Sequence, residues 1–312
     1  MTTLTQGTTQ ETSVNATSGQ IKQITRVGSD AIEKVLAELN LTKDGAQRVH
    51  SHGDEFASGI SEAARKLLLD LSVSDKFNDE EVESSYEYPP DYQGPHNIEK
   101  QIQAVAGMFN LNPKPALEYI KHLPSLDSFV PAQALPFVSW FAVPWYEAVN
   151  PEYTKAVQVT LDKLSSSRRF ENYRKGRIVP ERLRQLERTI RMMNQIHKHQ
   201  PGDIIILALQ LGRLHRGRSV RRARERFAGN EYGLNSFVGN VIALTHPERF
   251  EKNDELDMDL PGDEFDDPGS GDSFGRAPFL DFDDGRLGFG AGFVSRCFDD
   301  YGSGSGFLPQ PS

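Results

Sequence analysis

The densest cluster of residues that could bind an anion lies between Gly212 and Phe227, where arginines crowd a short turn and the helix after it. Guanidinium groups bind carboxylate and phosphate oxygens with a fixed two-pronged geometry, and a helix N-terminus also attracts anions. The glycines of the turn have neither Walker nor dinucleotide-binding spacing. We therefore predict a surface for nucleic acid or another polyanion, formed by Arg213, Arg216, Arg218, Ser219, Arg221, Arg222 and Arg224.

Two elements must position these arginines. Residues 204–209 form a short apolar block rich in β-branched side chains after a Pro-Gly-Asp turn, which predicts a buried strand. Ser219 is a suitable N-cap for the helix that follows. Three residues at helical spacing form its inward stripe and turn the arginines outward: Val220, Ala223 and Phe227.

This helix predicts a contrast in stability. Replacing Phe227 by alanine should cost about 3–5 kcal/mol, because a core aromatic ring is lost. We expect Arg221, Arg222 and Arg224 to be largely solvent-facing or paired with acids of the C-terminal tail. Replacing Arg221 and Arg222 together by alanine should cost under about 1 kcal/mol if they sit at the surface. The same double substitution should abolish polyanion binding.

Charge is unevenly distributed along the chain. Its 312 residues carry 35 Lys and Arg against 44 Asp and Glu, a net charge of −9. Residues 168–226 hold 17 basic and 5 acidic residues, whereas residues 251–312 hold 15 acidic and 4 basic residues. Such asymmetry indicates either an anionic partner or internal pairing of the two regions. The second hypothesis is therefore an interaction or scaffold protein whose acidic tail folds onto its own basic helix.

No catalytic motif is identified, and we predict no cofactor and no metal site. Cys297 is the single cysteine, which excludes an intrachain disulfide and a multi-cysteine metal centre. The carboxylates of the acidic stretch 263–272 could bind calcium through their oxygens, although the stretch does not have the EF-hand spacing. Calcium binding there is left as an alternative. A third hypothesis is an enzyme of unknown substrate, with a pocket at the junction of the two halves walled by Trp140 and Trp145.

The N-terminal stretch and the hydropathy of the sequence bear on where the protein is located in the cell. The first 19 residues have no positively charged start followed by an apolar run, so a secretory signal is not expected. No window approaches the roughly 18 apolar residues of a membrane span. We expect a soluble, cytoplasmic protein with no membrane partner.

The predicted fold is α+β: a helical N-terminal half followed by a small mixed or mainly antiparallel sheet with two or three covering helices. Its parts are a disordered arm at residues 1–24, a helical domain at 25–165, and an α+β domain at 166–312 with basic helices and an acidic, β-rich C-terminal part. Helices are expected at 54–71 and 150–164, and from Pro180 to His199. Strands are expected at 256–260 and 301–308, with a hairpin across Asp283-Asp284-Gly285.

Several phrases are distinctive beyond their composition: YPPDYQGP, FENYRKGRI, HRGRSVRRARERF, NEYGLNSF, LTHPERF, LPGDEF and YGSGSGFLPQ. They resemble a group of uncharacterised hypothetical proteins from uncultured bacterial genomes, across most of the chain after the N-terminal arm. The resemblance implies a bacterial source but no activity, ligand or site residue.

Overall fold

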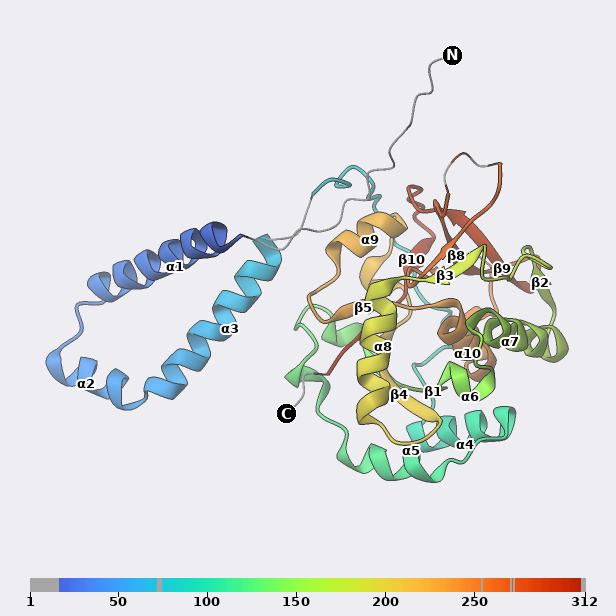
Figure 1. Cartoon of the computed structure of the whole chain (residues 1–312), viewed down its shortest axis with the longest axis horizontal. Helices are drawn as coiled ribbons and strands as arrows, with labels where there is room; N and C mark the ends of the chain where they lie inside the picture. The colour runs from blue at the N-terminus through green and yellow to red at the C-terminus, as the bar shows by residue number, and fades with distance from the viewer. Residues whose placement is uncertain (1–16, 72–74, 254, 270, 272, 310–312) are drawn as a thin grey trace, which may run out of the picture. The chain divides into compact units, whose positions relative to one another are not determined.

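The computed structural model describes residues 17–71, 75–253, 255–269, 271 and 273–309 (Figure 1). Ten α-helices and eleven strands in two sheets lie within this part of the chain, and most of the helices come before most of the strands, which confirms the predicted α+β class. Contacts divide the chain into two compact units, residues 1–72 and 73–312. The boundary that the sequence suggested near residue 165 falls inside the second unit, where strands from both sides of it pair in one sheet.

The first unit contains three amphipathic helices, α1 (Ser18–Glu38), α2 (Lys43–Ser51) and α3 (Gly53–Leu71). Thr17 begins α1 with a capping box, because its hydroxyl accepts the Gln20 N–H while its own N–H donates to the Gln20 side chain. The prediction of a disordered arm at 1–24 is therefore wrong for residues 18–24, which are helical. Residues 1–16 lie outside the described residues.

The first sheet of the second unit is centred on β4 (Ile204–Gln210), the strand predicted from the apolar block. All seven of its residues are buried. It pairs antiparallel with β1 (Ser139–Pro144) on one side and with β11 (Ser305–Phe307) on the other, and β11 continues to β5 (Glu231–Gly233). The end of the chain thus completes a sheet begun at residue 139.

The second sheet is mainly antiparallel, and most of it comes from the C-terminal part of the chain. Its longest pair is the predicted hairpin of β8 (Arg276–Asp283) and β9 (Arg286–Phe293). Asp284 and Gly285 both have positive φ, as a tight two-residue hairpin turn requires. The other strands are β2 (Phe170–Asn172), β3 (Leu183–Gln185), β6 (Asp257–Asp259), β7 (Asp263–Phe265) and β10 (Tyr301–Ser303). Two pairs are parallel, β2 with β9 and β6 with β10.

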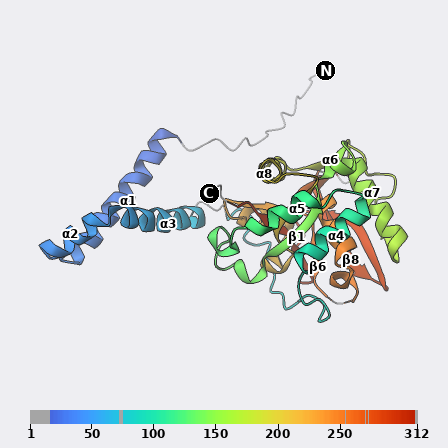
Figure 2. The same ribbon diagram turned by 90° about the horizontal axis from the view of Figure 1, so that it is seen from below.

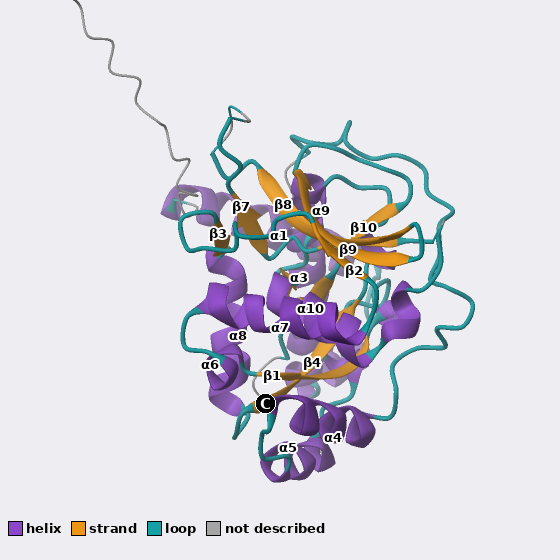
Figure 3. Cartoon of the chain, turned by 90° about the vertical axis from the view of Figure 1, so that its right-hand side faces the viewer, coloured by secondary structure: helices purple, strands orange, loops and turns teal. Residues whose placement is uncertain are grey.

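Helices separate and cover the two sheets (Figure 3). The apolar helix α10 (Ser236–Thr245) is buried along nearly its whole length, contacts β1 and β8, and has α7 (Tyr153–Ser167) beside it. Beyond the first sheet, α4 (Ile98–Phe109) contacts β1 and α5 (Lys114–Tyr119) contacts β4 (Figure 2). The remaining helices are α6 (Tyr146–Val149), α8 (Glu187–His199) and α9 (Val220–Arg226).

Two predicted elements differ in the structure. The helix expected from Pro180 begins only at Glu187, because residues 183–185 are held in the second sheet as β3, paired with β7. The single strand expected at 301–308 is two strands, since β10 joins the second sheet and β11 the first. The helices expected at 54–71 and 150–164 and the strand at 256–260 are present as α3, α7 and β6.

Candidate anion-binding surface

The start of α9 follows the sequence prediction. Ser219 is its N-cap, and its hydroxyl accepts the Arg222 N–H at 3.1 Å. Val220, Ala223 and Phe227 are buried, which confirms the inward stripe. The chain turns into the helix through Gly217, whose φ of +73° favours glycine.

The arginines of α9 do not all face solvent. Arg222 is 6% exposed, so the expectation that it points outward is wrong. Arg224 also folds inward, where its Nε donates to the Pro261 carbonyl at 2.9 Å and an Nη2–H to the Asp263 carbonyl at 2.8 Å. Arg221 is partly exposed, with 38% of its side-chain surface accessible. The helix thus uses two of its arginines as internal ties.

Most of the acids that neutralise this surface lie in one stretch before it, residues 75–87, which we call the acidic segment. Its backbone runs antiparallel to the turn before α9: the Val82 N–H donates to the Gly217 carbonyl at 2.8 Å, and the Ser219 N–H to the Glu80 carbonyl at 3.0 Å. A Cβ on Gly217 would lie 2.2 Å from the Val82 carbonyl oxygen. The backbones of the two segments are therefore in direct contact, and only glycine fits at position 217.

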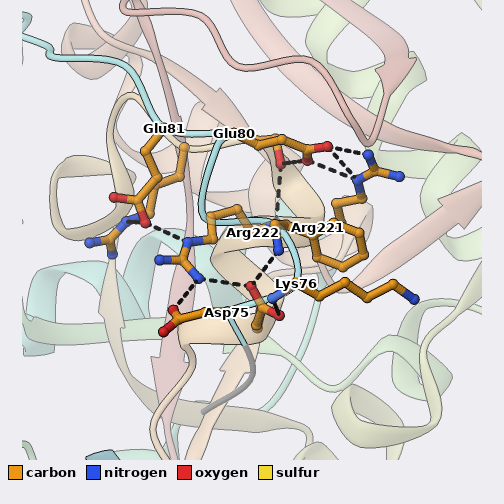
Figure 4. Close-up of polar contacts among 10 residues, drawn as sticks. Asp75, Lys76, Glu80, Glu81, Arg221 and Arg222 are labelled. Carbon is orange, nitrogen blue, oxygen red and sulfur yellow. Dashed lines mark hydrogen bonds and ion pairs between the residues drawn. The ribbon is translucent and has the colours of Figure 1, made fainter.

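Arg222 is the centre of the contact (Figure 4). Its guanidinium donates to Glu81 Oε1 at 2.6 Å, Asp75 Oδ1 at 3.0 Å and Glu225 Oε2 at 2.8 Å. Glu225 in turn accepts the backbone N–H groups of Lys76 and Phe77. Burial opposes the charge of Arg222, but these three carboxylates outweigh it and raise the pKa of the guanidinium. Glu81 and Asp75 thus join Arg222 to the acidic segment directly, and Glu225 of α9 joins the backbone of the same segment.

A second tie joins Glu80 to Arg221 and Ser219. The Glu80 carboxylate accepts the Arg221 Nε–H at 2.8 and 2.9 Å and the Ser219 hydroxyl at 2.6 Å. The Arg221 guanidinium also lies 4.3 Å from the centre of the Phe77 ring. The hydrogen bond from Arg221 holds the pKa of Glu80 below its usual value, although burial acts in the other direction. Glu80 therefore stays ionised against the surface that was predicted to bind a foreign anion.

The remaining predicted arginines also meet the acidic segment. Glu87 forms an ion pair with Arg213, whose Nε lies 2.6 Å from Glu87 Oε2, and accepts a hydrogen bond from Arg216. The Arg218 Nε lies 3.2 Å from Glu81 Oε1. Burial raises the pKa of Glu81, but Arg222 and Arg218 outweigh burial, and its pKa lies below the usual value. The structure thus brings six of the seven predicted residues onto one acidic segment. The exception is Arg224, whose nearest carboxylate belongs to Glu264 in β7.

A buried polar cluster beneath the surface contains a serine, a histidine and a glutamate. The Ser305 hydroxyl donates to Glu231 Oε1 at 2.5 Å, and His215 Nε2 bonds the same oxygen at 2.7 Å. Arg218 donates to the other ring nitrogen of His215 at 3.0 Å. The serine bonds the carboxylate and not the imidazole, and Ser305 and Glu231 are 0% and 2% exposed, so the hydroxyl is shut off from solvent. We interpret the cluster as structural.

The other sequence candidates lie in separate surroundings. In the stretch 263–272, Asp263 is buried and accepts the Tyr153 hydroxyl, Glu264 pairs with Arg184, and Asp267 pairs with Arg174 and Arg177. Residues 270 and 272 lie outside the described residues. No group of three or more metal-ligating side chains occurs in the described part of the chain. Trp140 packs on Phe129, and Trp145 stacks on His197.

Sequence reasoning missed the acidic segment as the partner of α9. Its cluster of acids, Asp79 to Glu83, was visible, but the tail beyond residue 251 is also acidic and lies closer in the sequence. Charge alone could not choose between the two. The missing signal was Gly217, which permits the close backbone approach of Val82.

Comparisons add no relative: no protein-family model, no curated protein and no solved structure matches the chain. Among the helices of the described residues, none is both long and apolar enough to cross a membrane.

Proposed function

We propose that the chain is an interaction protein whose arginine surface serves to bind its own acidic segment. The observation that carries this proposal is the set of ion pairs from Asp75, Glu80, Glu81 and Glu87 to the surface. The carboxylates supply the negative charge that a foreign polyanion would otherwise bring. This supports the hypothesis of internal basic–acidic pairing, with residues 75–87 as the main partner in place of the C-terminal tail.

The position of the acidic segment suggests what the pairing achieves. It begins four residues after Leu71, the end of α3, which is the last helix of the first unit. Through its bonds to Asp75 and to the backbone N–H groups of Lys76 and Phe77, α9 fixes the first residues of the second unit in place. We infer that the arginines anchor the first residues of the second unit.

Polyanion binding is a second candidate for the same surface. It is favoured by the partial exposure of Arg213, Arg216 and Arg221, each with about a third of its side-chain surface accessible. A nucleic acid or other polyanion would have to compete with the acidic segment for these guanidinium groups. Such binding would weaken steeply with salt, because it releases counterions.

A binding assay distinguishes the two candidates. Under the anchoring proposal, the native chain has little affinity for a fluorescent single-stranded oligonucleotide at about 50 mM salt. Neutralising the segment with Glu80→Gln and Glu81→Gln should release the arginines and raise that affinity at least about tenfold, a change of roughly 1.4 kcal/mol. Fluorescence anisotropy measures both values.

The matched control is Asp79→Asn with Glu83→Gln. These acids lie in the same segment, are exposed, and have no hydrogen bond or ion pair in the described structure. The control changes net charge equally, so it should leave affinity unchanged. Tight binding by the native chain that is lost in an Arg221→Ala, Arg222→Ala variant would instead favour the polyanion-binding function.

A further inference from the structure

The second sheet has one face turned away from α7 and α10, and aspartates gather on it. The register pairs Asp257 of β6 with Tyr301 of β10, and places Asp259 between Phe279 of β8 and Ser303 of β10. Continued by one residue, the β6–β8 register puts Asp281 opposite Asp257. Side chains of paired residues lie on the same face of a sheet. The opposite face carries the buried apolar residues Met258, Leu280 and Phe289.

Glycines on β9 let the side chains of this face lie flat against the sheet. A Cβ on Gly288 would lie 2.0 Å from Asp281 Oδ1 and 2.8 Å from the Tyr173 ring. A Cβ on Gly290 would lie 2.3 Å from the Phe279 ring. The Tyr173 and Phe279 rings therefore lie beside the carboxylates on this face.

Aromatic rings continue along the face. The Phe279 and Tyr301 rings meet edge to face with centroids 5.7 Å apart, and Phe298, 47% exposed, lies 5.7 Å from Tyr301. Tyr301 stands in the field of four carboxylates, those of Asp257, Asp281, Asp259 and Asp300, which add to burial in raising its pKa. The face thus combines aromatic surface with concentrated negative charge.

These aspartates differ from the acids of the acidic segment, because among the described residues arginines act on them only from beyond ion-pair distance: Arg249 on Asp257, Arg224 on Asp259 and Arg286 on Asp281. In the part of the chain that the structure describes, Asp257, Asp259, Asp281 and Asp300 form no ion pair. Asp281 Oδ1 is buried and has no hydrogen-bond partner among the described residues. Burial and the neighbouring Asp281 raise the pKa of Asp257 to about 8, and burial raises the pKa of Asp259 to about 7. Such uncompensated carboxylates cost stability.

A separate observation concerns a buried hydroxyl beside this row. Ser303 is 0% exposed, and its hydroxyl has no hydrogen-bond partner among the described residues. It is paired in register with Asp259, which is 9% exposed and has no side-chain hydrogen bond among the described contacts. Buried polar groups in folded proteins are normally satisfied. At the inner end of the carboxylate row, the Ser303 hydroxyl and the Asp259 carboxyl therefore have no hydrogen-bond partner among the described residues.

We propose that this face binds a small linear polyamine, whose ammonium groups are held by Asp257, Asp259 and Asp281 and whose methylenes lie along Phe279 and Tyr301. Ammonium groups donate hydrogen bonds to carboxylates and are attracted to aromatic ring faces. Aspartates two residues apart on a strand are separated by roughly 7 Å, so two ammonium groups joined by a short methylene chain can be held at once. A bare metal ion would make no use of the rings.

The test is calorimetric titration of spermidine into the full chain at low ionic strength and about pH 8, where the carboxylates are more fully ionised. Asp257→Asn and Asp281→Asn should each weaken binding at least about tenfold. Asp284→Asn, an equal charge change at the turn of the same hairpin, should leave it unchanged. Tyr301→Leu should weaken spermidine binding through loss of the ring.

Each outcome decides the proposal. No heat of binding at millimolar spermidine overturns it, and equal losses in Asp284→Asn and Asp281→Asn overturn it by showing attraction to net negative charge alone. Competition by Mg²⁺ at equal concentration would assign the face to a metal ion instead. Thermal unfolding separates binding from folding, because Asp257→Asn removes a like charge and should be no less stable than the native chain at pH 8.

Discussion

Replacing Arg222 by alanine should lower the free energy of unfolding by about 3–5 kcal/mol, the cost of breaking a buried ion pair from one side. The substitution leaves Glu225, whose side chain is 7% exposed, without its guanidinium and removes the donor to Glu81 and Asp75. Urea unfolding followed by circular dichroism measures the difference. Arg222→Met should lose nearly as much, because it keeps the aliphatic stem but not the charge.

Two variants on the same helix calibrate this result. Phe227→Ala should also cost about 3–5 kcal/mol, since the buried ring packs against His215 and Arg188. Arg221→Ala should cost only about 1 kcal/mol, because its side chain is 38% exposed. A loss below about 1 kcal/mol for Arg222→Ala would instead match a surface arginine and contradict the buried network.

Stability should fall by about 2 kcal/mol as pH rises from 6.5 to 8, at about 1.4 kcal/mol per unit for each group that holds a proton only when folded. Asp257 and Asp259 have folded pKa values of about 8 and about 7, whereas their ordinary value is 3.8. In this range the unfolded chain has already released these protons, so each further rise in pH favours unfolding. Urea unfolding at pH 6.5, 7, 7.5 and 8 gives the slope.

The window is chosen to exclude opposing groups. Burial lowers the pKa of His246 to about 4, so this histidine favours unfolding as pH falls below 6.5. The pKa values of Glu80 and Glu81 are lowered in the folded chain, so these groups reduce stability only when they become protonated at acidic pH. In Asp257→Asn, the fall in unfolding free energy between pH 6.5 and 8 should shrink to under about 1 kcal/mol, and the variant should be more stable than the native chain at pH 8. Asp284→Asn should keep the full fall. An unchanged slope in Asp257→Asn would show that this carboxylate is ionised in the folded state.

Features determined by neighbouring residues were predictable from the sequence. The apolar block at 204–209 is β4, the Asp-Gly turn closes the β8–β9 hairpin, and Ser219 caps α9. In each, the signal and the structure lie within about ten residues of one another. Local preference decides such elements when no distant contact opposes it.

Features determined by distant contacts were not predictable. Residues 183–185 read as helix, yet pairing with β7, about 80 residues later, places them in a sheet. Arg222 fits a helical surface position, but its partners Asp75 and Glu81 lie more than 140 residues before it. Helical periodicity separates the two faces of a helix without revealing what packs on the polar one. Most of the candidate residues therefore meet the acidic segment, while Arg224 lies near Glu264 of the acidic C-terminal tail.

If the arginine surface holds the acidic segment, the side chains of Glu80 and Arg221 must stabilise each other, and a double-mutant cycle between them measures this. Unfolding free energies of Glu80→Gln, Arg221→Ala and the double variant give the coupling between the two side chains. We predict a coupling of about 1 kcal/mol or more, because the carboxylate and guanidinium share several charge-assisted hydrogen bonds. Additive effects, within about 0.3–0.5 kcal/mol, would show that the two groups do not interact in the folded chain and would contradict the account.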